Sequence, residues 1–316
     1  LSKFVNRKFG IAVSSGTAAL DIAFTALNLK KNDEVILPAF TIISCLNPIL
    51  KAGAKPIFVD VDVETWNMNI DQIERKITKK TKIILAVHIY GLPTYMPKII
   101  KLAKKYKLKV IEDASEVIGQ KIHNRLCGSF GDISTFSFYT NKHITTGEGG
   151  MVFTNSRNLA QKSASLRNLF FEKKRFLHRE IGWNYRMSNL QAAVGLAQLE
   201  NISKIIKMKR KFGEMYFKRL KNLKFVTLQP KKNYFSNNIY WVIGIVIKNK
   251  KIKIKNVRKK LLDKGIQTRP FFWSLHKQPV LKKYKYYKKV KLPNSEYLSN
   301  NGFYLPSGLG LKENQI

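Results

Sequence analysis

The sequence predicts an α/β protein with a mostly parallel central sheet flanked by helices, followed by a smaller α+β domain. Two observations lead to this prediction. Over the first two-thirds of the 316 residues, short apolar runs alternate with helical patterns, as in a parallel sheet that is covered on both faces. After Gly182 a long helical pattern is followed by period-two alternation, which is typical of antiparallel strands. We place the boundary near residue 205, so the domains are 1–205 and 206–316.

The first domain begins with an expected strand at Ile11–Val13. The turn Ser14–Thr17 leads into a helix from Thr17 to Leu29, and Ser15 is well placed to cap it. Further strands are expected at Glu34–Leu37, Pro56–Val61, Lys82–Val87, Lys109–Glu112, Ile133–Phe138 and Met151–Thr154. Helices are expected at Ile43–Ala52, Ile70–Ile77 and Pro97–Tyr106.

The second part begins with a long helical pattern over Asn189–Ile205 that continues towards Leu220. Strands are expected at Lys224–Leu228 and Ile239–Ile247 and a helix at Val257–Lys264, and the chain ends inside a last helical pattern at Glu313–Ile316.

The formal net charge of +38 raises the question of nucleic-acid binding. The lysines are spread thinly, and in the densest stretch, 248–260, Ile and Val interleave with Lys as on a solvated face with an apolar underside. The sequence contains no zinc-finger, basic-zipper or RNP-like motif. We therefore predict a lysine-rich surface without nucleic-acid binding, and a polyanion site remains the alternative.

Cysteine and histidine usage gives little support to a disulfide framework or a metal site. The two cysteines, Cys45 and Cys127, are far apart in the sequence, and the five histidines are scattered. The chain carries no apolar run long enough to span a bilayer. We expect a cytoplasmic protein without a membrane segment.

Lys142 is the most informative residue. It lies in the turn 137–150, between two expected strands and beside a glycine-rich bend. A buried lysine whose pKa is lowered can carry an aldehyde cofactor as a Schiff base. Because lysine is common in this chain, the interpretation depends on partners elsewhere in the sequence.

Asp113 follows an expected strand, at the edge of a parallel sheet where ligands bind. A carboxylate there can keep a ring nitrogen protonated, and Glu116 could lie on the same side of the turn. A capping Asp and a surface Glu are the alternative. The turn that includes Gly16 and Thr17 is either a phosphate cradle or an ordinary helix start. Ser137 is either a phosphate ligand or a buried strand serine.

Two further segments carry polar residues. Arg269 and His276 lie in the aromatic-rich stretch 268–276, which could line a substrate site or form a packed hinge. Asn184 lies in the polar loop that precedes the long helix, whose N-cap would be Ser188.

Taken together, these segments resemble the DegT/DnrJ/EryC1/StrS family of pyridoxal-phosphate sugar aminotransferases, which have fold type I. The resemblance covers nearly the whole chain, in the family's order and spacing. The segments that carry it are Ser15–Leu20, Leu37–Thr41, Val59–Asp62, Ile111–Ala114, Gly128–Asp132, Ser137–Gly150, Gly182–Ser188, Leu190–Ala193 and Leu305–Gly308.

The resemblance implies a role for each matched residue. Lys142 would form the Schiff base with pyridoxal 5'-phosphate and move the proton, and Asp113 would pair with the ring nitrogen. Glu116 would lie near the ring, and Gly16, Thr17 and Ser137 would hold the phosphate. Asn184 would reach the phosphate of a neighbouring subunit, so the resemblance implies a homodimer with shared active sites. Apart from the resemblance, we expect Arg269 and His276, in the aromatic-rich stretch, to be substrate contacts.

The sequence departs from the family pattern at two places. Ile42 stands where many members have an aromatic residue stacked on the cofactor, which implies apolar stacking or an aromatic from elsewhere. The chain also lacks the usual N-terminal leader and stops within the last helical pattern, so we expect a fragment.

The implied reaction moves an amino group from L-glutamate to a keto sugar linked to a nucleoside diphosphate, for polysaccharide or glycan biosynthesis. The segment Asn141–Met151 most resembles the GDP-perosamine synthase branch, which aminates C4 of a 4-keto-6-deoxy sugar. A sister group of dehydratases has histidine at the position of Lys142, so the lysine favours transamination. The alternatives are a dehydratase or a regulatory member without activity.

Overall fold

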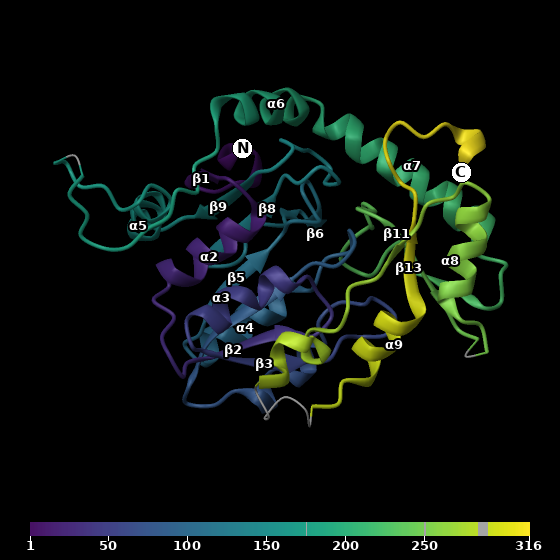
Figure 1. Ribbon diagram of the computed structural model, residues 1–316, viewed down its shortest axis with the longest axis horizontal. Coiled ribbons are helices and arrows are strands. Elements are labelled where there is room, and N and C mark those ends of the chain that lie inside the picture. Colours follow the sequence, from purple (N-terminus) through teal and green to yellow (C-terminus); the bar gives the residue numbers. More distant parts are fainter. Residues whose placement is uncertain (175, 250, 284–289) are drawn as a thin grey trace.

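A seven-stranded sheet forms the core of the first part of the molecule. The computed structural model describes residues 1–174, 176–249, 251–283 and 290–316. The strand order is β1-β9-β8-β5-β4-β2-β3 (Figure 1). The strands are β1 (Phe9–Val13), β2 (Glu34–Pro38), β3 (Lys55–Val59), β4 (Thr81–Val87), β5 (Lys109–Asp113), β8 (Ile133–Ser137) and β9 (Gly150–Thr154).

The sheet is parallel from β3 to β8, and β9 runs antiparallel between β8 and β1. The carboxyl ends of β1, β2, β4, β5 and β8 therefore meet at one edge of the sheet, which we call the carboxyl edge. This confirms the predicted mostly parallel α/β fold. Each predicted strand of the first domain has a counterpart within one or two residues.

Helices cover both faces of this sheet because successive strand residues point to opposite sides and both sides are apolar. On one face, Ile83 and Leu85 join an apolar cluster with helices α2 and α5, and on the other, Ile84 and Ala86 join one with α4. The helices of the first part are α1 (Ser2–Val5), α2 (Gly16–Ala26), α3 (Asn47–Lys51), α4 (Met96–Lys105) and α5 (Arg157–Arg167). A small hairpin consists of β6 (Lys121–Ile122) and β7 (Arg125–Leu126).

The second part contains an antiparallel sheet of four strands in the order β10-β11-β13-β12. Figure 1 shows this sheet beside α7 and α8, with α6 and α7 running along the upper side of the molecule. The strands are β10 (Val226–Leu228), β11 (Ile243–Ile247), β12 (Arg269–Pro270) and β13 (Gly302–Leu305). The helices are α6 (Asn189–Glu200), α7 (Ile202–Leu220), α8 (Ile254–Asp263) and α9 (Pro293–Asn301).

Several predicted helices are shorter than expected or form 3₁₀ turns in place of α-helices. The helical pattern 70–77 forms two 3₁₀ turns, η2 (Ile70–Gln72) and η3 (Glu74–Lys76), and the pattern 43–52 begins as the 3₁₀ turn η1 (Ile43–Cys45) before α3. The long helix divides at Asn201 into α6 and α7. The last pattern is a 3₁₀ turn, η7 (Glu313–Gln315). Further 3₁₀ turns are η4 (Leu275–Lys277) and η5 (Pro279–Lys283).

Among the described residues, the helices are all too short or too polar to cross a bilayer.

Candidate active site

A cavity of about 360 Å³ opens at the carboxyl edge of the seven-stranded sheet. The turns that follow β1, β2, β4, β5 and β8 all contribute to its lining, as the parallel arrangement requires. Six of the predicted site residues line this one cavity: Gly16, Thr17, Asp113, Glu116, Ser137 and Lys142. Residues that lie up to 126 positions apart in the sequence, from Gly16 to Lys142, are thereby brought together.

The amine of Lys142 lies between an acidic and an aromatic group. Its Nζ is 3.7 Å from Oε1 of Glu116 and 3.6 Å from the ring centroid of Trp241. Burial lowers the pKa of the Lys142 amine below its usual value, although the carboxylates of Glu116 and Asp113 act in the opposite direction. A buried amine whose pKa is lowered is suited to forming a covalent bond to a carbonyl group.

Glu116 is the proton-exchanging partner that this geometry offers. Burial raises the pKa of Glu116 to about 7, against the opposing effect of Lys142 and of the hydrogen bond that the backbone N–H of Tyr90 donates to Oε2 at 2.8 Å. A carboxyl group with this pKa can take up or release a proton near neutral pH. The lysine amine and this carboxyl group can therefore share a proton.

Asp113 ends β5, and its carboxylate faces the cavity from the sheet. Oδ1 accepts a hydrogen bond from the backbone N–H of Ser115 at 3.1 Å, and Oδ2 accepts one from Sγ of Cys45 at 3.5 Å. Both partners are uncharged, so the carboxylate keeps its capacity to pair with a cation inside the cavity.

The start of α2 approaches Ser137 closely enough to form an anion site. An added Cβ at Gly16 would lie 2.7 Å from Cβ of Ser137, so a larger residue does not fit there. Ser15 Oγ caps the backbone N–H of Ala18 at 3.0 Å, and the hydroxyls of Thr17 and Ser44 hydrogen bond at 2.9 Å. The N–H groups at a helix start and these hydroxyls suit a phosphate, so we call Gly16, Thr17 and Ser137 the phosphate cradle.

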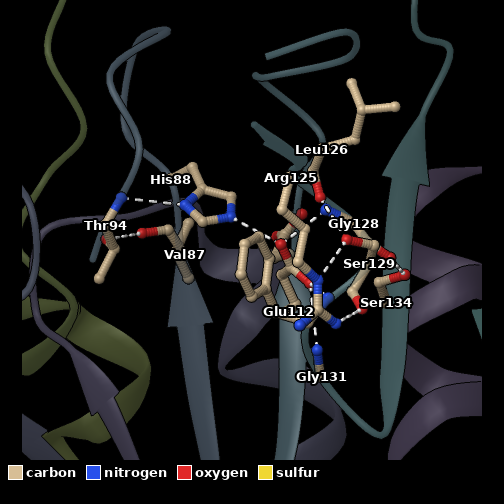
Figure 2. Close-up of polar contacts among 12 residues, drawn as sticks. Val87, His88, Thr94, Glu112, Arg125, Leu126, Gly128, Ser129, Gly131 and Ser134 are labelled. Atoms are coloured by element: carbon tan, nitrogen blue, oxygen red, sulfur yellow. Dashed lines mark hydrogen bonds and ion pairs between the residues drawn. The ribbon is translucent and has the colours of Figure 1, made fainter. Parts of the chain in front are cut away.

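His88 also lies at the carboxyl edge, although it was not predicted as a site residue. It follows β4, and its imidazole is fully buried between two partners. As Figure 2 shows, Nδ1 accepts a hydrogen bond from the backbone N–H of Thr94 at 3.0 Å, while Nε2 lies 3.1 Å from Oε1 of Glu112. The proton of a neutral ring must therefore be on Nε2. The rule that singled out Asp113, a polar residue directly after a parallel strand, would also have found His88.

The ligand atoms of His88, Glu112 and Cys127 lie within 4.8 Å of one another, which is close enough to hold a metal ion. The Nε2 proton of His88 points at Glu112, which also accepts backbone N–H groups. Burial and the charge of Glu112 raise the pKa of the Cys127 thiol well above its usual value, so sulfur keeps its proton. His88 and Glu112 are therefore committed to hydrogen bonds and Cys127 keeps its proton, which does not suit a metal ion.

Aromatic side chains from the second part of the molecule complete the cavity. Trp241, Phe272 and Tyr304 line it together with Ile42. Ile42 is the aliphatic residue at the position where an aromatic was expected from the family pattern. The indole N–H of Trp241 donates to the carbonyl of Asn141 at 2.8 Å, which fixes the ring beside Lys142. Phe272 belongs to the aromatic-rich stretch 268–276 that was expected to line a substrate site, whereas no local pattern marks Trp241 and Tyr304, because only long-range packing brings them to the cavity.

The remaining predicted site residues lie outside this cavity. Arg269 is exposed on β12 and lines a neighbouring cavity of about 450 Å³ that also contains Lys142 and Trp241. Asn184 pairs with Asn168 in a β-bridge and does not line either cavity.

His276, in contrast, is buried at the other end of its loop. Its Nε2 lies 3.0 Å from Oε1 of Glu296 on α9, and the residue lines neither cavity. The structure thus gives this histidine a packing role, and we do not propose it again as a substrate contact.

The mostly parallel sheet with helices on both faces, the buried lysine and the opposing carboxylate at the carboxyl edge define a transferase of the pyridoxal-phosphate-dependent fold type I. The family model of the DegT/DnrJ/EryC1/StrS aminotransferase family matches residues 1–316. The chain therefore belongs to this aminotransferase family.

Individual relatives agree with this assignment. The chain is 42% identical over 324 aligned residues to GDP-perosamine synthase from Escherichia coli O157:H7, covering 100% of this chain and 87% of the relative. A solved DegT/DnrJ/EryC1/StrS aminotransferase from Brucella abortus is 27% identical with a TM-score of 0.89, covering 99% of this chain and 84% of that chain. The E. coli GDP-4-keto-6-deoxy-D-mannose-3-dehydratase with bound hydrated PLP is 26% identical with a TM-score of 0.86, covering 98% and 85%.

Proposed function

We propose that this protein uses pyridoxal 5'-phosphate to transfer an amino group from L-glutamate to C4 of a GDP-linked 4-keto-6-deoxy sugar. The observation that carries the proposal is the meeting of Lys142, Asp113 and the phosphate cradle in one cavity. The substrate part of the proposal is supported by the 42% identity to a GDP-perosamine synthase along the whole chain. The two cysteines are buried free thiols, which suits the reducing cytoplasm that we propose as its location.

The residues present fit this cofactor. Gly16, Thr17 and Ser137 would hold the phosphate, Asp113 would face the ring nitrogen, and Lys142 would hold the aldehyde carbon. When bound, the cofactor supplies an electron sink for the carbon that loses its proton. The fit rests on the space between Gly16 and Ser137, where a Cβ has no room, and on the carboxylate and amine that line the same cavity.

The chain's own residues then handle the protons. Lys142, once its amine is free, would move a proton between the substrate carbon and the cofactor, because its amine lines the cavity. Glu116, with a pKa of about 7 and 3.7 Å away, would take the excess proton from the amine. Trp241 packs against the amine and would exclude water from it.

The neighbouring cavity of about 450 Å³ is the proposed place of the nucleotide-linked sugar, because it shares Lys142 and Trp241 with the first cavity. It also contains two basic groups, Arg269 and Lys209. Lys209 is buried and donates to the carbonyls of Trp241 at 3.0 Å and Ser307 at 2.7 Å, and burial lowers its pKa to about 8. Arg269 is exposed and so is the better candidate to contact a diphosphate.

A second copy of this chain is the proposed partner. Helix α6 has no buried residue of its own, and Leu190 on it is 83% exposed. Ile181, in the preceding loop, is 89% exposed. Val194, one helical turn after Leu190, is 49% exposed as well, so α6 presents neighbouring exposed apolar side chains, as an interaction surface does. The bridge between Asn168 and Asn184 ties this loop together, so a partner on this surface would meet Asn184.

The proposed function is tested with the purified protein and pyridoxal phosphate. We expect a yellow protein whose visible band changes when L-glutamate is added, and an aminated product when a GDP-linked 4-keto-6-deoxy sugar follows. Mass spectrometry of the products from GDP-, UDP- and dTDP-linked keto sugars identifies the nucleotide. A colourless protein would refute the proposal.

A dehydratase is the second candidate, because the E. coli dehydratase has the same fold. The retained amine of Lys142 favours amination, since it can both bind the cofactor and move a proton. Loss of water from the sugar without incorporation of nitrogen from labelled glutamate would support the dehydratase instead.

The proposed dimer is tested by sedimentation of the protein and of Leu190→Asp. We expect the protein to sediment as a dimer and the variant to shift towards monomer, because a charge replaces an exposed apolar contact. Lys207→Asp, on the following helix, is the control for an added acidic group. A monomeric parent protein, or a variant that remains dimeric, would contradict the proposed interface.

A further inference from the structure

Cys45 contacts the carboxylate that the proposed cofactor would need. It ends the 3₁₀ turn η1, directly behind the cavity, and it is completely buried. Its Sγ lies 3.5 Å from Oδ2 of Asp113 and 3.6 Å from the hydroxyl of Thr41. The thiol does not line the cavity, so it can act on a bound group only through Asp113.

The direction of these hydrogen bonds follows from their chemistry. An ionised carboxylate can only accept, so the single S–H of Cys45 donates to Asp113. The sulfur is then left as an acceptor, and the hydroxyl of Thr41 is its donor. The three groups form an ordered chain from Thr41 through Cys45 to Asp113, which fixes one oxygen of the carboxylate.

The thiol remains a donor over the working pH range. Burial and the negative charge of Asp113 raise the pKa of the Cys45 thiol well above its usual value. A thiolate nucleophile is thus excluded at this position. The backbone N–H of Ser115 fixes the other oxygen of Asp113 at 3.1 Å, so the carboxylate is held from both sides.

We propose that Cys45 is a positioning residue for the cofactor: its thiol orients Asp113 towards the ring nitrogen while withdrawing little of the carboxylate's negative charge. The inference rests on the proposed function, since it concerns the same site. An S–H group is a weaker donor than an O–H group. The thiol therefore fixes the direction of the carboxylate and leaves its charge available for the pyridinium ring.

The test uses Cys45→Ala, which removes the donor, and Cys45→Ser, which keeps a donor but makes it stronger. Cys127→Ala is the matched control, because Cys127 is the other buried free thiol and lies beside Glu112. For each protein, the dissociation constant of pyridoxal phosphate and the pH midpoint of the visible band are measured. Thermal unfolding without cofactor shows whether the variants are folded.

We expect Cys45→Ala to bind the cofactor about three- to tenfold more weakly, the size expected when one hydrogen bond from a weak donor is lost. Cys45→Ser should bind nearly as well as the parent protein but shift the pH midpoint, because a stronger donor weakens the charge of Asp113. Cys127→Ala should change neither quantity.

The inference is overturned if Cys45→Ala binds the cofactor as the parent protein does, or if Cys45→Ser and Cys45→Ala lose the same affinity, which would indicate packing alone. If Cys45→Ala does not fold, an unshifted pH midpoint in Cys45→Ser overturns it. Failure of the proposed function gives a different result, because the parent protein then binds no cofactor or Asp113→Asn binds it equally well.

Discussion

Glu112 and Glu116 lie four residues apart at the carboxyl edge, and both side chains are buried, yet their surroundings are opposite. Glu112 accepts hydrogen bonds from His88 and from the backbone N–H groups of Gly128, Phe130 and Gly131 (Figure 2). Burial opposes ionisation of Glu112, but these donors lower its pKa below the usual value. Glu116 accepts from one backbone N–H and faces Lys142, and burial raises its pKa to about 7.

The comparison shows that burial alone does not identify a reactive carboxyl group. The number of fixed donors decides whether the charge is locked in place or can be exchanged. Glu112 holds the turn 128–131 against the sheet, and Glu116 is left able to exchange a proton with Lys142. Buried groups with strongly shifted pKa values of this kind are typical of functional sites.

The largest effect on activity is expected at Lys142, the residue that Glu116 faces in the cavity. Lys142→Met keeps the apolar stem but removes the amine, and we expect amination to fall by at least about 1000-fold. The unfolding free energy of the cofactor-free protein should change by less than about 1 kcal/mol, since burial raises the pKa of Glu116 and this carboxyl group can stay protonated once the amine is gone. Product assays and urea unfolding measure the two quantities. Retained amination would remove Lys142 from the mechanism.

Substitution of Glu112 is expected to lower the stability of the protein. Both carboxylate oxygens of Glu112 accept backbone N–H groups, so in Glu112→Gln the amide N–H₂ group faces another donor in either orientation. We expect the free energy of unfolding to fall by about 2–4 kcal/mol. Urea unfolding of the cofactor-free protein measures this. The exposed Glu64→Gln is the control. A loss no greater than that of the control would show that the cluster around Glu112 is not structural.

The smallest effect is the pH dependence of stability. Because the pKa of Glu116 is raised from 4.5 to about 7 on folding, the folded state holds a proton that the unfolded state releases. This group's contribution therefore declines as pH rises from about 4.5 to 7, by about 1–3 kcal/mol. Glu116→Gln should flatten this decline in the cofactor-free protein. Glu112 cannot cause this decline, because its pKa is lowered on folding, so its contribution to stability rises with pH, and does so below about pH 4.5. An unchanged slope in Glu116→Gln would contradict the assignment.

The sequence predicted the sheet and its carboxyl edge well because apolar strand patterns are local. Asp113, Ser137 and the start of α2 follow strands directly, so the parallel arrangement brought them into one cavity. Short helical patterns were less reliable. Residues 70–77 form two 3₁₀ turns, and no local signal distinguished these from a short α-helix.

The residues that the sequence did not reveal are those whose position depends on the second part of the molecule. Trp241 was expected within a strand over Ile239–Ile247, but β11 begins at Ile243 and leaves the indole free to turn towards Lys142. Tyr304 lies on β13, which was not predicted at all. The domain boundary near residue 205 and the shared site of a dimer remain predictions.

The pairing of β1 with β9 has a consequence for the order of assembly during synthesis. Phe9 lies opposite Thr154, so the first strand finds its neighbour only after more than a hundred further residues have been made. Pairings this distant along the chain form slowly, because a long loop must close first. On the ribosome, β1 therefore remains unpaired, and the protein is open to chaperones or to misassociation until β9 emerges.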